Sequence, residues 1–405
     1  MKNDSSRLAT LVLEDGTLFS GKSYGFHPPH VSQLSTDQCI CAELVFNTAM
    51  TGYVEILSDP SYIQQIVLLT SAHVGNYGVD ALWSERLFEQ NIDEIITSEA
   101  LIVHNLYSGP IPQGRMPLDE FMKINKKMLI ADVDTRAVTR HIRSEGSQQA
   151  TVIGGSPEEI EGKIADILTI IKHSQHITGS PVAEQAGIKR KETITPKYPV
   201  QTPARQENPS SKDKKKAAPA TSGKKKKLIL LDLGAKRSLL QLFKEFDCIA
   251  LPSTMGAEDI LEELPDAVLV SNGPGDPASL KKSIELIQEL IGKTVLFGIC
   301  LGHQLLSLAL GAKTYKLPFG HHGANHAVKD LRTNRVFVVS ENHGFAVDSS
   351  TLPKDVHPWF TNTSDQTLEG IYSDVYKVYS VQFHPEAGPG PHDARSVLSH
   401  FRTVI

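Results

Sequence analysis

Short apolar runs alternate with segments of helical spacing through residues 228–311, and this alternation constrains the fold more than any other feature of the sequence. The segment 235–246, for example, places Leu239, Leu242 and Phe243 on one helical face. Strands that are apolar on both faces are typical of a parallel sheet covered by helices. We therefore predict an α/β domain whose functional loops follow the carboxyl ends of the strands. The apolar runs are 228–233, 248–251, 267–270 and 294–299.

The first 178 residues have a less regular pattern. A hairpin is predicted over 8–19, around the turn residues Glu14, Asp15 and Gly16, because apolar runs flank a glycine-containing turn. These residues indicate a mixed α/β domain whose topology the sequence leaves open. Further strands are predicted at 43–46 and 65–70, and helices at 80–90 and 134–145.

Positive charge is concentrated in residues 179–227, which contain 13 Lys/Arg but only four Asp/Glu. The whole chain has a formal charge of −5, so the remaining residues together carry −14. With six prolines and few large apolar residues, this segment cannot offset its ordering entropy by burial, and we predict a mobile linker. It would join domains at 1–178 and 228–405.

A nucleic-acid-binding or nuclear-targeting tract is the alternative interpretation of this basic segment. No aromatic residues interleave its lysine runs, so no nucleic-acid partner is expected.

Composition also bears on the compartment. The chain lacks an apolar run of about 18 residues, and its first ten residues are polar, so we expect neither a membrane span nor export. Four scattered cysteines do not form a disulfide framework or a zinc-site spacing. A cytoplasmic protein with free thiols is expected.

Cys300 lies in the sequence Gly298-Ile299-Cys300-Leu301-Gly302, directly after an apolar strand and directly before a predicted helix. This is the pattern of a nucleophile elbow, in which flanking glycines permit a sharp turn. The amino end of the following helix would favour the thiolate. A buried structural cysteine is the alternative, but the glycines in this context favour a catalytic nucleophile.

A base and an orienting group for such a nucleophile are available at His384 and Glu386. Residues 379–386 alternate as a strand does, so side chains two positions apart project to the same side. Glu386 could then hold the imidazole of His384 in one tautomer while the other ring nitrogen faces Cys300. Considered alone, a histidine and a glutamate near a strand end are more often a solvated surface pair, and the combination with the glycine-flanked Cys300 is what favours catalysis.

The loop Asn272–Pro277 also follows a predicted strand. The N–H groups of Gly273 and Gly275 can turn into one concavity, and with the N–H of Leu301 they could hold an oxyanion. A plain turn is the alternative, but the loop lies one strand–helix unit before Cys300.

Together these segments resemble a class I, triad-type glutamine amidotransferase domain, with Cys300, His384 and Glu386 matching its Cys-His-Glu triad. Both halves of the chain resemble the small subunit of carbamoyl-phosphate synthase, and the resemblance fails only in the linker. In the C-terminal half it rests on Asn272–Pro277, Phe297–Gln304, Asn342–Phe345, His384–Glu386, Leu233–Arg237, Phe319–Gly323 and Pro389–Asp393; in the N-terminal half it rests on Phe46–Tyr53, Asp59–Tyr62, Gly75–Gly78 and Asp134–Arg136.

The resemblance implies hydrolysis of L-glutamine. Ammonia would pass to a separate large subunit, which makes carbamoyl phosphate from bicarbonate and two ATP for arginine and pyrimidine synthesis. Because Ser61 precedes the linker, the two domains are expected to pack together over the glutamine site. The family's glutamine-binding positions fall on Ser61, Gly273, Gly275, Leu301, Gln304, Asn342, Gly344 and Phe345.

No segment resembles an ATP-grasp region, so the resemblance implies no cofactor in this chain and places ATP and Mg²⁺ on the large-subunit partner. Two other functions stay open at this point. One is a free-standing Cys hydrolase of γ-glutamyl compounds, and the other is a non-catalytic regulatory scaffold.

Several other polar residues have ordinary interpretations. His321, His322 and His326 suggest a metal cluster, but adjacent side chains diverge and no carboxylate or cysteine stands at ligand spacing, so no metal is expected. His303 is interpreted as a packed or capping histidine. Glu341 is interpreted as a loop carboxylate.

Overall fold

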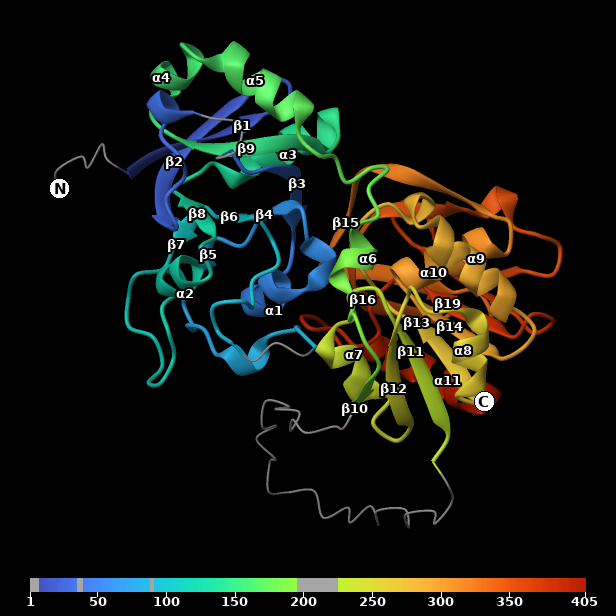
Figure 1. Ribbon diagram of the computed structural model, residues 1–405. Coiled ribbons are helices and arrows are strands. Elements are labelled where there is room, and N and C mark those ends of the chain that lie inside the picture. The colour runs from blue at the N-terminus through green and yellow to red at the C-terminus, as the bar shows by residue number, and fades with distance from the viewer. Residues whose placement is uncertain (1–6, 35–38, 88–90, 195–224) are drawn as a thin grey trace.

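The computed structural model describes residues 7–34, 39–87, 91–194 and 225–405. Its N-terminal and C-terminal halves lie side by side (Figure 1). The N-terminal half contains β1 (Leu8–Leu13), β2 (Leu18–Gly25), β3 (Cys41–Asn47), α1 (Tyr53–Ser58), β4 (Gln65–Leu69), β5 (His73–Val74), β6 (Ala100–Ile102), β7 (Asn105–Leu106), α2 (Leu118–Ile124), β8 (Met128–Ala131), α3 (Thr135–Glu145), β9 (Gln148–Gly154), α4 (Pro157–Glu161) and α5 (Ile164–His173).

A closed barrel in the strand order β1-β2-β8-β6-β4-β3-β9 forms the centre of the N-terminal half. Alternate strand residues such as Leu11, Leu44 and Ile66 form one buried cluster, and their neighbours in sequence, such as Val45 and Val67, pack outward against α1 and α2. This two-sided burial explains why the strands lack the clean polar–apolar alternation of a half-exposed sheet. The predicted hairpin is confirmed as the antiparallel pair β1–β2.

The helix predicted at 134–145 is confirmed as α3, which begins where the Asp134 carboxylate accepts the N–H of Ala137. The helix predicted at 80–90 is wrong over the described residues 80–87, which hold only a single 3₁₀ turn at Ala81–Trp83. Side chains compete for the backbone there, because Asp80 accepts the N–H of Leu82 and Ser84 accepts that of Arg86.

The C-terminal half contains α6 (Val182–Ala186), β10 (Glu192–Ile194), β11 (Lys227–Asp232), α7 (Arg237–Leu242), β12 (Asp247–Pro252), α8 (Ala257–Glu262), β13 (Ala267–Val270), α9 (Lys281–Leu290), β14 (Val295–Ile299), α10 (Leu301–Ala309), β15 (Lys313–Asp330), β16 (Val336–Asp348), β17 (His357–Asn362), β18 (Leu368–Ser373), β19 (Val378–Val381) and α11 (Val397–Val404).

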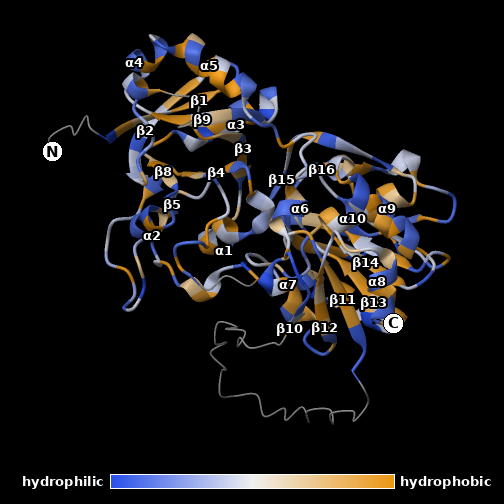
Figure 2. Cartoon of the chain, in the orientation of Figure 1, coloured by the Kyte–Doolittle hydropathy of each residue, from blue (hydrophilic) through white to orange (hydrophobic). Residues whose placement is uncertain are grey.

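These strands form one sheet in the order β10-β12-β11-β13-β14-β19-β18-β16-β15-β17. The central strands β12, β11, β13, β14 and β19 run parallel, as predicted, and the pairings at both flanks are antiparallel. One face of the sheet is buried under α7 and α11, and the other under α8, α9 and α10. The apolar colouring of the central strands in Figure 2 reflects this double burial. The predicted α/β class is confirmed.

The structure differs from the predicted linker over residues 179–194. The helix α6 buries Ala183 against the sheet, and β10 pairs with β12. Asp276 accepts the N–H of Gly179, and Asp232 accepts the N–H of Ile188. Specific carboxylate acceptors and sheet pairing therefore order a segment whose composition alone favours disorder. The lysine run at 214–216 lies outside the described residues, as does Lys224, the first residue of the run at 224–227.

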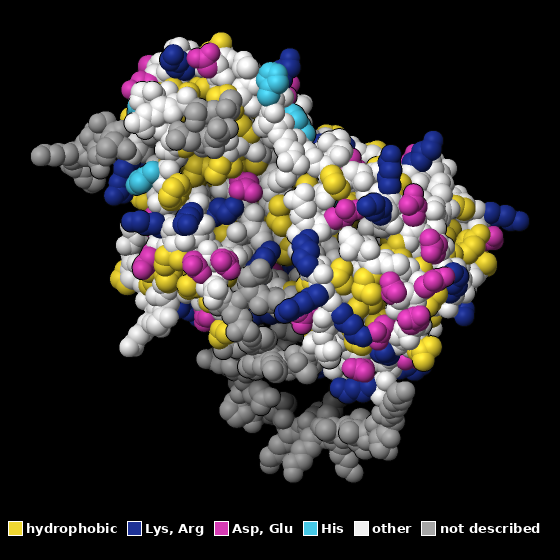
Figure 3. Space-filling view, viewed as in Figure 1, with side chains coloured by type: hydrophobic (Ala, Val, Ile, Leu, Met, Phe, Trp, Pro, Cys, Tyr) yellow, Lys and Arg dark blue, Asp and Glu magenta, His cyan; other side chains and the backbone are white. Residues whose placement is uncertain are grey.

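On the face shown in Figure 3, basic and acidic side chains are interspersed over the C-terminal half. Among the described residues, no helix has the length and apolar character needed to cross a membrane.

Candidate active site

Cys300 lies between β14 and α10 with a φ of 54°, a left-handed backbone conformation that an L-residue adopts only under constraint. The constraint comes from Gly302, where a β-carbon would lie 2.1 Å from the carbonyl oxygen of Val270. A β-carbon on Gly298 would likewise lie 2.7 Å from the backbone of Gly302. The two glycines therefore allow α10 to begin directly against the sheet, with Cys300 at the turn.

His384 and Glu386 follow β19, the strand next to β14, and both are buried. Nδ1 of His384 lies 2.5 Å from Oε1 of Glu386. Burial opposes a charge on His384, but its interactions with the Glu386 carboxylate and with Cys300 outweigh it and raise the pKa of His384 to about 10. Nε2 of His384 has no hydrogen-bond partner among the described residues. In a catalytic triad, this nitrogen exchanges protons with the nucleophile and the substrate.

A buried lysine that the sequence reasoning missed completes this group. Lys236 is fully buried, donates to the carbonyl of Ala387 at 2.6 Å and lies 3.3 Å from Glu386. Although burial opposes ionisation of Glu386, His384 and Lys236 together lower its pKa to about 2. Glu386 is thus held as a carboxylate. No spacing in the sequence marks Lys236 as buried.

All eight positions predicted to bind glutamine line one cleft together with Cys300. Among the parallel strands, the cleft lies at the carboxyl ends of β13 and β14, whose following segments contribute Gly273, Gly275 and Cys300 to its lining. It is also lined by residues that the sequence reasoning did not select, because they occupy ordinary strand or loop positions. These are Glu43, Gln65, Ile177, His322 and His343.

The two halves of the chain meet at this cleft, as Ser61 led us to expect. Asn272 donates to the Ser61 hydroxyl at 3.1 Å, and Asn342 donates to Asp59 at 3.2 Å. The Glu43 carboxylate of β3 forms an ion pair with Lys316 of β15. Asn272 of the loop after β13 and Asn342 of β16 thereby join the sheet domain to the segment between α1 and β4.

The structure also places the three other groups of polar residues that the sequence singled out. His303 is fully buried with Nδ1 2.9 Å from the Ser380 hydroxyl, and burial lowers its pKa to about 3, consistent with the predicted packed histidine. His321 and His322 diverge as expected. The expectation that Glu341 is a loop carboxylate is wrong, because it is buried in β16 with Oε2 2.9 Å from Nδ1 of His321.

Two family models match the chain. Residues 11–152 match the carbamoyl-phosphate synthase small chain, CPSase domain, and residues 229–403 match glutamine amidotransferase class-I.

Curated relatives are similar over nearly the whole chain. The carbamoyl phosphate synthase small chain of Photorhabdus laumondii is 38% identical over 401 residues, covering 98% of this chain and 96% of that protein. The protein of the same name from Methanocaldococcus jannaschii is 39% identical over 388 residues, covering 95% of each chain. The chain therefore belongs to the carbamoyl-phosphate synthase small chain family, and it is the glutamine-hydrolysing, amidotransferase subunit of that ligase.

Proposed function

We propose that this chain hydrolyses L-glutamine through Cys300, His384 and Glu386, and that it delivers the ammonia to a large subunit. The observation that carries the proposal is the shared cleft: the nucleophile and all eight expected glutamine positions line it. The residues come from both halves of the chain, so chance proximity along one loop does not account for it.

In the first half of the reaction, the Cys300 thiolate attacks the carbon of the glutamine side-chain amide. The resulting oxyanion is held by backbone N–H groups of Leu301 and of the loop containing Gly273 and Gly275. A β-carbon on Gly273 would lie 2.2 Å from the carbonyl oxygen of Leu233, so only glycine fits this close approach. The carbon–nitrogen bond breaks as His384 protonates the departing ammonia.

In the second half, Nε2 of His384 takes a proton from water, and the resulting hydroxide attacks the γ-glutamyl thioester. The carbon–sulfur bond breaks, which releases glutamate and restores the thiolate. Glu386 holds the imidazole through Nδ1 in both halves. Lys236 keeps Glu386 charged and thereby preserves that orientation.

The partner is a large subunit that binds ATP and Mg²⁺ and converts bicarbonate and ammonia to carbamoyl phosphate, a precursor of arginine and pyrimidines. The small-chain family supports this partner. A free-standing hydrolase or a scaffold has no specific observation in its favour.

The substitution Cys300→Ala tests the proposal in the complex with the large subunit. Glutamine-dependent synthesis should fall by at least about 10³-fold, because the residual rate lacks the covalent step, while ammonia-dependent synthesis should remain. Carbamoyl phosphate formation is measured with each nitrogen source. Loss of both activities in a stably folded complex would mean that Cys300 serves assembly, and retention of both would mean that it does no chemistry.

A further inference from the structure

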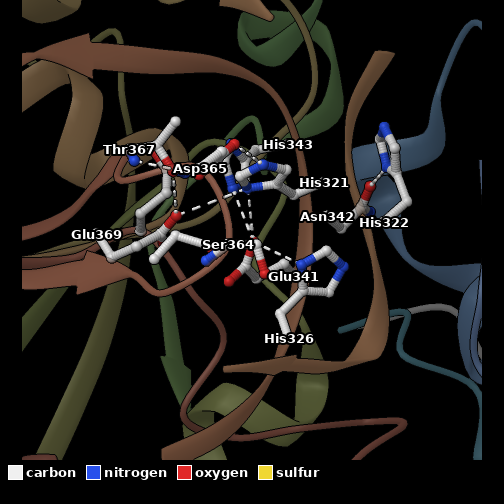
Figure 4. A network of polar contacts seen from close by, with 12 residues as sticks. His321, His322, His326, Glu341, Asn342, His343, Ser364, Asp365, Thr367 and Glu369 are labelled. Atoms are coloured by element: carbon white, nitrogen blue, oxygen red, sulfur yellow. Dashed lines mark hydrogen bonds and ion pairs between the residues drawn. The ribbon is translucent and has the colours of Figure 1, made fainter. Parts of the chain in front are cut away.

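Four buried side chains converge on one face of the sheet beside the glutamine cleft. His321 of β15 and His343 of β16 are paired across the two strands, Glu341 lies two residues before His343, and Glu369 comes from β18. Figure 4 shows all four pointing toward one another. Their side chains are at most 9% exposed. Strand pairing therefore brings together two imidazoles and two carboxylates that lie far apart in the sequence.

The separations between their donor atoms fit a shared small cation. One donor atom from each of the four residues lies within 4.8 Å of the others. Oε2 of Glu341 is 2.9 Å from Nδ1 of His321 and 3.3 Å from Nε2 of His343, and Nδ1 of His321 is 3.6 Å from Oε1 of Glu369. Ligands held at the bond lengths of tetrahedral zinc lie about 3.3 Å apart.

In each of the two histidines, one ring nitrogen points away from the cluster and the other points into it. The hydrogen bond made by the outward nitrogen determines whether the inward nitrogen carries a lone pair. Nδ1 of His343 lies 2.8 Å from the carbonyl of Phe345, which can only accept, so a neutral ring has its lone pair on Nε2. Nε2 of His321 lies 2.8 Å from the Asp365 carboxylate, which places that ring's lone pair on Nδ1. A carboxylate or carbonyl behind each ligating histidine is the usual support of a metal site.

When both rings are neutral in these tautomers, Nδ1 of His321, Nε2 of His343 and the carboxylate oxygens that they face are all acceptors. Nδ1 of His321 has no hydrogen-bond partner among the described residues although Oε2 of Glu341 is 2.9 Å away. The carboxylate oxygens nearest the histidines contact Nε2 of His343 and the Thr367 hydroxyl, whereas the second oxygen of each carboxylate, Oε1 of Glu341 and Oε2 of Glu369, is buried without a partner among the described residues. Beside two neutral imidazoles, the two buried carboxylates can both be ionised only if a counterion is present, because two uncompensated buried charges are costly. A divalent cation neutralises that charge and uses the inward lone pairs at once.

We propose that His321, Glu341, His343 and Glu369 bind one divalent transition-metal ion, for which Zn²⁺ is the test ion. Imidazole nitrogens with carboxylate oxygens suit such ions, and four protein ligands make a closed, structural site. The ion would join β15, β16 and β18. Asn342 lies between two of the ligands in β16 and faces the glutamine cleft, so the ion would also hold that part of the cleft in place.

Metal binding is measured on the full chain after chelation and desalting. We expect one Zn²⁺ per chain by titration calorimetry and elemental analysis, an increase in melting temperature with Zn²⁺, and a visible absorption band of tetrahedral Co²⁺ when Co²⁺ replaces it. These readouts do not depend on glutamine hydrolysis. A wild-type chain that binds neither ion stoichiometrically overturns the proposal, and the cluster is then an ion-pair network around a protonated His321.

Ligand variants locate the ion. Glu341→Gln and Glu369→Gln should each weaken Zn²⁺ binding by at least tenfold and remove the Co²⁺ band, because each keeps the size of the side chain but removes a charged ligand. Glu289→Gln, at an exposed position of α9, is the matched control and should bind as the wild type does. Folding is checked by circular dichroism. Unchanged binding in both folded ligand variants would place the ion elsewhere and contradict the assignment.

Discussion

Several ionisable side chains of this chain are buried, and their protonation states depend on the groups next to them. Lys236 is buried against Glu386, and its loss would leave that carboxylate without its buried cation. Glu55 of α1 is a contrasting case, because its Oε2 atom is buried without a hydrogen-bond partner among the described residues. Burial raises the pKa of Glu55 to about 7, and the Glu85 carboxylate adds to the increase.

The substitution Glu55→Gln should stabilise the chain in a pH-dependent way. An unfolded glutamate ionises near pH 4.5, whereas the raised pKa delays ionisation of Glu55 in the fold, so native stability falls between pH 4.5 and about 7. Glutamine avoids this loss. We expect a gain of about 1–3 kcal/mol at pH 8 and little gain at pH 4, measured by thermal unfolding.

The exposed Glu285→Gln of α9 is the control for this comparison and should change stability by less than about 0.5 kcal/mol at both pH values. An equal gain for Glu55→Gln at both pH values would show that its charge is not responsible.

At the scale of elements, the site depends on how closely α10 approaches the sheet. The helix begins at Leu301 against β13 and β14, and the close contact between Gly302 and Val270 positions it. The amino end of α10 thus lies at the cleft, next to the Cys300 side chain. Packing of this one helix sets both the turn at Cys300 and the direction of the Leu301 N–H.

The substitution Gly302→Ala should displace α10, because the new β-carbon would lie 2.1 Å from the carbonyl oxygen of Val270. We expect a loss of about 1–3 kcal/mol in stability and a fall of about 10²-fold in glutamine-dependent synthesis, since small displacements at a nucleophile are costly. Thermal unfolding and carbamoyl phosphate formation from both nitrogen sources are measured.

Gly162→Ala is the matched control for Gly302→Ala. Gly162 has an ordinary helical φ of −64°, and an added β-carbon would make only normal contacts. Wild-type glutamine-dependent activity in Gly302→Ala would show that the close approach of α10 is not needed.

At the scale of the whole molecule, the cleft exists only where the barrel and the sheet meet. Ser61 and Glu43 come from the N-terminal half, and Cys300 and Asn342 come from the C-terminal half. The contacts of Asn272 with Ser61 and of Asn342 with Asp59 span this boundary. The N-terminal half therefore contributes to the glutamine site as well as to the interface between halves.

The substitution Ser61→Ala tests this shared construction. Removing the hydroxyl deletes one polar contact at the cleft, which should raise KM for glutamine about five- to tenfold with a smaller change in kcat. Ammonia-dependent synthesis should not change. Ser349→Ala, at an exposed position remote from the cleft lining, is the control, and an unchanged KM in Ser61→Ala would remove Ser61 from the glutamine site.

Much of the fold and of the candidate site can be predicted from residues that lie close together in the sequence. The alternation of apolar runs and helical spacing predicts the parallel strands, and the glycines around Cys300 predict the turn, because each depends on residues a few positions apart. The predicted contact of His384 with Glu386 is present, but the strand predicted over 379–386 ends at Val381, so the contact forms in the segment after β19.

Only the tertiary structure decided features that depend on partners distant in sequence. The Asp232 and Asp276 carboxylates order residues 179–194, against the bias of their composition. Lys236 becomes a buried cation because the fold encloses it with Glu386. Strand pairing brings His321 to Glu341 and Glu369, although their spacing in the chain suggests no site. Local sequence patterns thus predicted the alternating strands and helices of the C-terminal half and the three residues proposed as a triad, whereas long-range pairing and burial determined their charged surroundings.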